Sequence, residues 1–497
     1  MLFVSLIFLF LFLPSVLIGY YSLIRWRKVQ NIFLFFSSLF FYAWGEPKFS
    51  LILLISILIN WLLALLIDKS KYSFLEKTFL IFDILFNLSL LFYYKYIDFT
   101  ITQINSLFAT NFTLTKVLLP IGISFFTFQA ISYVIDVYKG KKDKTICAQI
   151  NPINVGLYIA FFPQLIAGPI VRYNTFEQQI YDRKESLALF NNGVIRFMVG
   201  FSKKILLANS IGAIADRIFA YNPSELAVSL AWLGAISYTF QIYFDFSGYS
   251  DMAIGLAKMF GFNFEENFNL PYKAISIREF WKRWHISLSS WFKDYVYIPL
   301  GGSNCSRIKN LFNLFIVWLL TGIWHSANYT FVIWGLFYFV LLLLEKKFIY
   351  KSSLHEVRHD NQLYNNEDYC SQKRHCEVLK EPWQSKILSF LKHIYVLLCV
   401  ILAWVLFRSP NLLFAKDFIK AMFYNSNIWS FFTWVLIKEN IFFFIFSLLL
   451  SFYSFKNILE LNNWKSDCIK LFILICFLIS IVYLINNTYN PFIYFNF

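Results

Sequence analysis

Long apolar runs separated by short polar segments recur along the whole chain. A helix needs about 20 apolar residues to cross the hydrocarbon core of a bilayer, and we count roughly eleven to thirteen candidate spans. The first five cover residues 2–24, 31–42, 49–67, 78–96 and 117–137. The second run is too short for a full crossing, so we expect it to be tilted, broken or re-entrant. The pattern therefore predicts an all-α polytopic membrane protein.

The charges between these runs indicate how the chain is oriented. Residues 2–24 have no basic residue before them and no cleavage signature after them, so we expect a retained first helix that starts outside. The connectors 68–77 and 139–144 contain several lysines, whereas 98–115 contains no basic residue. Basic connectors remain on the cytoplasmic side of membranes. We therefore place 98–115 on the outer side.

Beyond residue 152 the apolar runs become shorter and interrupted. Pro and Gly break residues 161–169, and 191–207 is only partly apolar. Backbone breaks at membrane depth usually surround a site, because lipid cannot hydrogen-bond the freed amides. We expect a single domain, and no internal repeat supports an inverted-repeat transporter. Its parts are N-terminal helices (1–150), core helices (151–344), a polar cytoplasmic loop (345–392) and C-terminal helices (393–497).

Composition agrees with a lipid environment. The chain has 497 residues, of which 58% are hydrophobic and 15% charged, whereas soluble domains have about 25% charged residues. A net charge of +15 would indicate a nucleic-acid partner in a soluble protein. Here Lys and Arg follow the positive-inside pattern instead, so we expect no nucleic acid. The seven cysteines show no metal-ligand spacing, and we expect no metal.

The strongest candidate for chemistry is the sequence Thr321-Gly-Ile-Trp-His-Ser-Ala-Asn328, which sets His325 between two apolar runs. An ionisable residue within the membrane is a functional hypothesis by default. Burial disfavours the imidazolium form, so a neutral ring could remove a proton from an attacking hydroxyl, as acyl transfer to an alcohol requires. We expect Asn328 on the same helical face, where it could orient the ring or polarise the acyl carbonyl, and Trp324 beside the substrate. The alternative is a core histidine bonded to a neighbouring helix.

A second candidate lies in the tryptophan-rich segment 278–302. Its spacing predicts one amphipathic helix over 278–295. The apolar stripe suits the headgroup level of the membrane and comprises Trp281, Trp284, Leu288, Trp291 and Tyr295. The basic face could bind the phosphates of a donor such as coenzyme A and comprises Arg278, Lys282, Arg283 and Ser289. His285 at the seam could position donor or acceptor, although an interfacial anchor with Arg and Lys on lipid phosphates would give the same pattern.

A third candidate is the pair Gln241 and Asp245, spaced i and i+4 in the apolar run 231–260. Two such groups in a membrane helix must find polar partners. They could bind substrate hydroxyls, although locking the helix to a polar or basic neighbour is the commoner role. We interpret Pro120 with Gly122 as a kink.

Several ordered motifs resemble the membrane-bound O-acyltransferase family, in the branch that acetylates alginate and peptidoglycan. The matches are Gln241–Gly255, Glu266-Asn-Phe268, Glu279–Gly302, Gly322–Asn328 and Trp404-Val-Leu-Phe-Arg408. The resemblance implies helices around a central funnel, and it places the two family histidines at His285 and His325, with the second as the catalytic one. The family's usual Trp-His-Gly-Ala-Asn is Trp-His-Ser-Ala-Asn here, and Ser326 affects packing more than activity.

The resemblance further implies acetyl-CoA as cytoplasmic donor and passage of the acetyl group through the bacterial inner membrane. Its recipient would be a periplasmic esterase-like acetyltransferase of the SGNH type, which modifies a polysaccharide such as peptidoglycan or an alginate-like polymer. One alternative is transfer of D-alanine from a carrier protein to teichoic acid, against which the length and Trp404–Arg408 count. Another is a proton-coupled transporter in which His325 and Asp245 relay protons.

Overall fold

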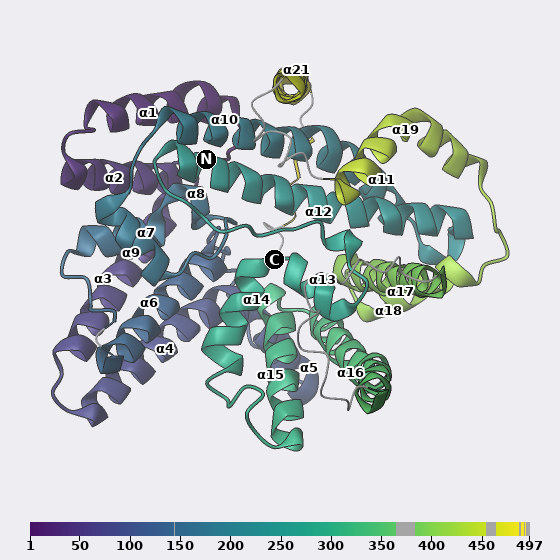
Figure 1. The fold of residues 1–497 in the computed structure, drawn as a ribbon, viewed down its shortest axis with the longest axis horizontal. Helices are drawn as coiled ribbons and strands as arrows, with labels where there is room; N and C mark the ends of the chain where they lie inside the picture. Colours follow the sequence, from purple (N-terminus) through teal and green to yellow (C-terminus); the bar gives the residue numbers. More distant parts are fainter. Residues whose placement is uncertain (144, 364–382, 454–463, 487–488, 492, 494–497) are drawn as a thin grey trace.

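The computed structural model describes residues 1–497 apart from 144, 364–382, 454–463, 487–488, 492 and 494–497. Every regular element in the described part of the chain is a helix, which confirms the predicted all-α class (Figure 1). Elements far apart in sequence pack together, and the 32-residue helix α12 (Val228–Met259) crosses the middle of the molecule.

Helices α1 to α4 and α6 form a group at one side of the molecule, whereas α5 lies beside α15 (Arg307–His325) and α16 (Tyr329–Leu363) (Figure 1). Helix α2 has 19 residues, so the second element is not broken, whereas a tilted or re-entrant placement stays a prediction. The helix is longer because it includes polar residues at its start, from Arg27 to Gln30. The outer connector also contains an unexpected amphipathic helix, α5. The bounds are η1 (Phe8–Phe12), α1 (Leu13–Ser22), α2 (Arg27–Gly45), α3 (Pro47–Lys69), α4 (Ser73–Lys95), α5 (Ile97–Phe108) and α6 (Ile123–Asp143).

The middle of the chain packs against α12. Glycines face each other where α10 crosses it: a Cβ on Gly200 would lie 2.5 Å from the carbonyl oxygen of Gly248. Small residues of this kind let two membrane helices approach closely. The bounds are α7 (Pro152–Ala160), α8 (Phe162–Leu165), α9 (Tyr173–Asp182), α10 (Leu187–Ser202), η2 (Lys203–Ala208), α11 (Asn209–Phe219) and η3 (Pro223–Glu225).

The last part contains the helices that carry the histidine motif. The expected polar loop 345–392 is wrong at both flanks, because α16 continues to Leu363 and α17 begins at Trp383, while 364–382 lie outside the described residues. The bounds are η4 (Pro271–Lys273), α13 (Ile277–Arg283), α14 (Ile286–Phe292), η5 (Lys293–Tyr297), α15 (Arg307–His325), α16 (Tyr329–Leu363), α17 (Trp383–Arg408), α18 (Leu412–Phe423), α19 (Phe431–Phe452) and α21 (Trp464–Asn486).

Six helical stretches in the described part of the chain are long and apolar enough to cross a membrane. They are Pro47–Lys69, Leu187–Phe219, Tyr329–Lys347, Ile387–Arg408, Phe431–Phe452 and Trp464–Asn486. Other apolar runs form helices that are buried within the protein. One of them is α12, which is enclosed by its neighbours and contains buried Asp245 and Asp251. The chain is a multi-pass membrane protein in which part of the apolar sequence packs against protein.

The two ends of α15 lie among different partners. At its start, Asn310 accepts a hydrogen bond from Lys346 (3.1 Å), the basic end of the α16 span. At its end, the Tyr96 hydroxyl donates to the carbonyl of Ile323 (2.6 Å), and Tyr329 bonds Gln103 of α5 (2.8 Å). His325 and α5 therefore lie at one end of this 19-residue helix, and Lys346 lies at the other end.

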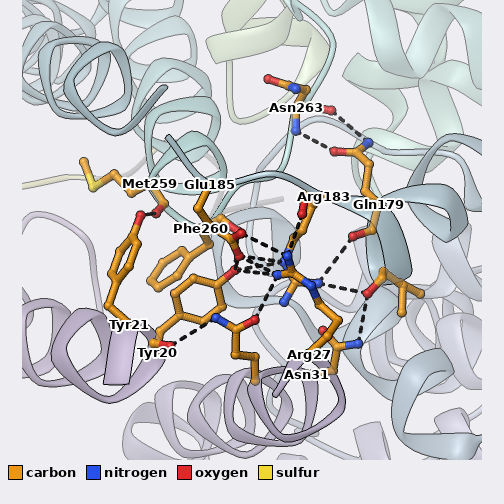
Figure 2. A network of polar contacts seen from close by, with 12 residues as sticks. Tyr20, Tyr21, Arg27, Asn31, Gln179, Arg183, Glu185, Met259, Phe260 and Asn263 are labelled. Carbon is orange, nitrogen blue, oxygen red and sulfur yellow. Dashed lines mark hydrogen bonds and ion pairs between the residues drawn. The ribbon is translucent and has the colours of Figure 1, made fainter. Parts of the chain in front are cut away.

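An ion network fixes the first two helices to the rest of the fold (Figure 2). Arg27 binds both carboxylate oxygens of Glu185, at 2.5 and 2.9 Å. The Tyr20 hydroxyl contacts Glu185 and the carbonyl of Phe260 (2.8 Å) at the end of α12. Buried Arg183 donates to the Tyr20 hydroxyl at 2.9 Å. The network therefore holds α1, α2, α9 and α12 together. Its effect on the site is indirect.

Candidate functional site

His325 is the last residue of α15. The helix ends there because Ser326 is extended (φ −161°, ψ 158°). The imidazole is 5% exposed, and three rings surround it edge-on: Trp324, Trp334 and Phe407, with centroids 4.9, 5.0 and 5.1 Å away. Its Nδ1 atom is buried and has no hydrogen-bond partner among the described residues. A nitrogen with an unused lone pair or proton is what a proton-transfer site requires.

Asn328 does not share a helical face with His325, so that expectation is wrong. Because α15 stops at His325, Asn328 lies in the turn before α16. Its amide donates to the carbonyl of Pro410 (2.8 Å), and its oxygen accepts from the backbone of Thr330 (3.1 Å). Asn328 thus caps α16 and ties it to the segment after α17, and its place in substrate binding stays a prediction.

A small cavity of about 40 Å³ lies beside His325. A water needs about 10–15 Å³ of such space, so two or three water-sized groups fit. The cavity has room for an acetyl group and an attacking oxygen. Its walls are Lys95, Leu119–Phe125, Ile166, Trp324 and His325.

The Pro120–Phe125 turn, interpreted from sequence as a kink, forms one wall of this cavity. Gly122 has a φ of +78°, and a Cβ there would lie 2.6 Å from the carbonyl oxygen of Leu165. Only glycine fits this backbone and this close approach without strain. The kink therefore shapes the site.

His285 lies between α13 and α14 in a left-handed conformation (φ 42°, ψ 56°) and is 1% exposed. Its Nδ1 lies 3.2 Å from Oδ1 of Asn267, which also accepts from the backbone N–H (3.2 Å) and hydroxyl (2.9 Å) of Ser287. Since that oxygen is an acceptor, Nδ1 carries the proton and Nε2 carries a lone pair. Nε2 is buried without a partner among the described residues.

Trp324 lies between the two histidines. Its ring centroid is 4.9 Å from that of His325 and 6.2 Å from that of His285. Phe125, from the cavity wall, packs edge-on against the same indole at 5.7 Å. The structure thus brings His285, Trp324 and His325 together, as the two-histidine prediction requires.

The predicted single helix over 278–295 is wrong. The left-handed His285 divides it into α13 and α14, followed by the π-helix η5. The tryptophan stripe is also buried, with Trp281, Trp284 and Trp291 each at most 9% exposed, so it is not at the headgroup level. Trp291 stacks on Phe128 with centroids 3.8 Å apart. Because the helix breaks at His285, α13 and α14 both pack against the protein core.

The predicted basic face is separate from the His325 cavity, since none of its four described members lines it. Arg278 and Lys282 are exposed. Arg283 pairs with Glu279 (2.8 Å) and donates to the carbonyl of Asn269 (3.1 Å). Ser289 is partly exposed. Their binding of donor phosphates stays a prediction.

Asp245 is occupied by contacts within the protein. Its Oδ1 pairs with Lys204 (2.5 Å), both side chains being 2% exposed, and Oδ2 accepts from the backbone N–H of Ile493 (2.9 Å). Gln241, one turn earlier, packs against Gly212, where a Cβ would lie 2.7 Å from its Nε2. These contacts match the helix-locking alternative, and a role in substrate binding stays a prediction.

For two residues that lie beside the histidines, the sequence predicted no role. Asn267, within the quoted Glu-Asn-Phe match, orients His285. Lys95 lies near the end of the predicted run 78–96 and lines the His325 cavity. A lysine at the end of a membrane run is a detectable signal, although snorkelling to the interface explains it equally well. As for metals, no group of three His, Cys, Asp or Glu side chains suited to an ion occurs in the described part of the chain.

Comparison with known proteins places this geometry in context. The sequence model of the MBOAT, membrane-bound O-acyltransferase family, matches residues 146–366, which include both histidines. A probable alginate O-acetylase of Pseudomonas aeruginosa is 40% identical over 88% of this chain and 77% of its own length. A peptidoglycan O-acetyltransferase of Helicobacter pylori is 34% identical over 84% and 78%, respectively. A teichoic acid D-alanyltransferase of Bacillus subtilis is 30% identical over only 45% and 58%.

Proposed function

This chain belongs to the membrane-bound O-acyltransferase family, and we propose that it takes acetyl groups from cytoplasmic acetyl-CoA and delivers them across a bacterial inner membrane. The acetyl groups then serve the O-acetylation of a cell-surface polysaccharide, either peptidoglycan or an alginate-like polymer. Relatives named for both acceptors cover most of the chain. The observation that carries the proposal is the buried His325 imidazole on the wall of an acetyl-sized cavity.

In the proposed reaction, His325 acts as general base. Its neutral imidazole removes the proton from the acceptor hydroxyl as the oxygen attacks the thioester carbonyl. A carbon–oxygen bond forms, the carbonyl electrons move to its oxygen, and the carbon–sulfur bond then breaks. The imidazolium returns its proton to the leaving thiolate, which departs as the thiol of coenzyme A. The dry, aromatic surroundings of His325 favour the neutral starting form.

We assign His285 to positioning of the reactants. Its Nδ1–H is held by Asn267, so Nε2 presents a lone pair on the other side of Trp324. That lone pair can accept a hydrogen bond from the acceptor hydroxyl or from the departing thiol. Trp324, between the two rings, would pack against the acyl group.

The charges at the two ends of α15 support the proposed direction of transfer. Four basic residues lie at the start of α15, which favours a cytoplasmic position for this end. They are Arg307 and Lys309 of α15, and Lys346 and Lys347 of α16. His325 lies at the other end of α15, beside α5. The connector that contains α5, residues 98–115, has no basic residue. The acceptor would therefore approach the cavity from outside and the donor from inside. Arg278, Lys282, Arg283 and Ser289 are the proposed contacts for the donor's phosphates.

We propose that a separate partner serves the final acceptor. A periplasmic esterase-like acetyltransferase of the SGNH type would take the acetyl group at the outer face and pass it to the polysaccharide.

Donor labelling tests the proposal. Membranes that contain the protein are incubated with acetyl-CoA labelled in its acetyl group, and release or transfer of the label is measured against membranes without the protein. We expect acetyl turnover that depends on the protein and none from a D-alanyl carrier protein. Turnover of the D-alanyl donor, or none of acetyl-CoA, would overturn the assignment.

A further inference from the structure

Lys95, the last residue of α4, brings an ammonium group to the catalytic cavity. Its Nζ donates to the carbonyl of Trp324 (2.5 Å) and to the hydroxyl of Ser124 (3.3 Å). It also lies 5.7 Å from the centre of the Trp324 ring. Lys95 and His325 are both wall residues of the 40 Å³ cavity. The cation is thus fixed within the same small space as the proposed base.

Within the described part of the chain, the contacts of the Lys95 amine include no acid that would compensate a positive charge on it. Its partners among the described residues are a carbonyl, a hydroxyl and an indole face, and none of them is an acid. By contrast, buried Lys204 and partly exposed Lys141 each pair with a carboxylate. A cation in an apolar region is costly unless an anion compensates it. An anion that forms only during the reaction would do so.

From this geometry we infer that Lys95 is a catalytic residue, whose ammonium binds the acyl carbonyl oxygen and stabilises the oxyanion that forms on it. The ammonium has three N–H donors, of which Trp324 and Ser124 take two. The third is available to the cavity. This inference rests on the proposed function, in which His325 removes the acceptor proton.

The reaction step is balanced without any further reagent. When the acceptor oxygen attacks, the carbonyl π electrons move to the carbonyl oxygen, which becomes negative beside Nζ. When that oxygen re-forms its double bond, the thiolate leaves with the carbon–sulfur electrons and takes the proton from His325. Lys95 keeps its proton throughout. Its contribution is electrostatic, because it is placed in advance where negative charge develops.

The backbone around Lys95 holds this position. Tyr96, the next residue, donates to the carbonyl of Ile323 (2.6 Å), so two consecutive side chains bind the last-turn carbonyls of α15. Basic groups at a helix C-terminus also complement its dipole. Lys95 therefore has a structural contact and a catalytic one, and the test must separate them.

The test compares three variants of the full-length protein in membranes. Lys95→Met removes the charge and keeps the length, and Lys95→Arg keeps the charge. Lys95→Cys allows the ammonium to be rebuilt by alkylation with 2-bromoethylamine. Acetyl-CoA turnover gives kcat and KM. We expect Lys95→Met to lower kcat about 100-fold, the usual loss for one oxyanion donor, with KM within threefold, and alkylation of Lys95→Cys to restore at least a tenth of wild-type kcat.

The matched control is Lys141→Met. Lys141 also donates to two carbonyls at a helix end, those of Ile67 and Ser70, but lies outside the cavity. We expect it to keep kcat within threefold. Alkylated wild-type protein controls for the exposed Cys147 and Cys468.

The outcomes separate the two proposals. An inactive wild type would remove the proposed function itself. An active wild type in which Lys95→Met keeps kcat within threefold would overturn only the role of Lys95. So would folded Lys95→Cys whose lost activity alkylation does not restore, because the lysine would then act through packing. If Lys95→Met does not fold, the alkylation result on Lys95→Cys decides.

Discussion

The Oδ1 atom of Asn267 lies 3.2 Å from Nδ1 of His285, and it is the contact that fixes which ring nitrogen carries the proton. Asn267 is fully buried, and it also fixes the start of α14 through Ser287. Its single carbonyl oxygen thus sets both the tautomer and the direction of the ring.

Replacement of Asn267 should therefore weaken catalysis through His285. In Asn267→Ala the ring loses its hydrogen bond, at a cost of about 1–2 kcal/mol, and acetyl turnover should fall roughly tenfold. Asn269→Ala, on the exposed part of the same loop, should leave turnover unchanged. Equal turnover in both variants would show that His285 needs no orientation.

The Gly122 turn should tolerate no side chain. Gly122→Ala combines a positive φ with a Cβ 2.6 Å from Leu165 O, so we expect a lower unfolding temperature and at least tenfold less turnover. Gly302→Ala is the matched control, since φ is +56° there but the nearest atom lies 3.8 Å from the new Cβ. A Gly122→Ala variant no worse than Gly302→Ala would mean that the cavity wall can move.

The Asp245–Lys204 pair should act on stability and not on substrate. Asp245→Asn leaves the Lys204 charge buried, so we expect a loss of about 3–5 kcal/mol, seen as a lower unfolding temperature in detergent. The double variant Asp245→Leu with Lys204→Met should recover most of the stability and turnover. Asp467→Asn, at an exposed pair with Lys470, should change stability by less than about 0.5 kcal/mol. A folded but inactive double variant would instead place Asp245 at the substrate.

The Glu185 network should make stability depend on pH. Burial raises the pKa of Glu185, but hydrogen bonds from Arg27 and Tyr20 outweigh it and hold the pKa below its ordinary value. A lowered carboxyl pKa stabilises the fold above the unfolded-state pKa of about 4.3, and this contribution disappears as the pH falls below it.

Glu185→Gln should therefore lower stability by about 2 kcal/mol at pH 7, and the difference in stability from wild type should narrow only as the pH falls below about 4.3. Thermal unfolding in detergent at pH 7, 5, 4 and 3 measures this difference. Exposed Glu265→Gln should show no difference from wild type at any of these pH values. A difference for Glu185→Gln that stays the same at pH 3 as at pH 7 would contradict the charged network.

Sequence patterns predicted the all-helical class, which the structure confirms, and they identified both histidines as candidates, whose roles stay predictions. They did not predict the partners. The helical position of Asn328 relative to His325 was wrong, since nothing in the pattern shows that Ser326 is extended. Likewise, the left-handed φ of His285 divides a helix that has unbroken amphipathic spacing.

Long-range contacts account for the rest. Lys95 and Trp324 are 229 residues apart in sequence, and only the packing of α4 against the end of α15 brings them together. The sequence favoured a structural role for Asp245 over substrate binding but could not identify its partners, which are Lys204 and Ile493. Apolar length also does not show which runs face protein, and α12 is enclosed by its neighbours.

The most direct test of the account is acetyl-CoA turnover by His325→Gln beside His393→Gln. Glutamine keeps a hydrogen-bonding side chain of similar size but cannot act as a base at neutral pH. His393 lies on α17 and bonds the carbonyl of Ala274 (3.2 Å), away from the cavity. We predict a loss of about 100-fold or more for His325→Gln and wild-type turnover for His393→Gln. A folded His325→Gln protein that turns over acetyl-CoA at the wild-type rate would contradict the account.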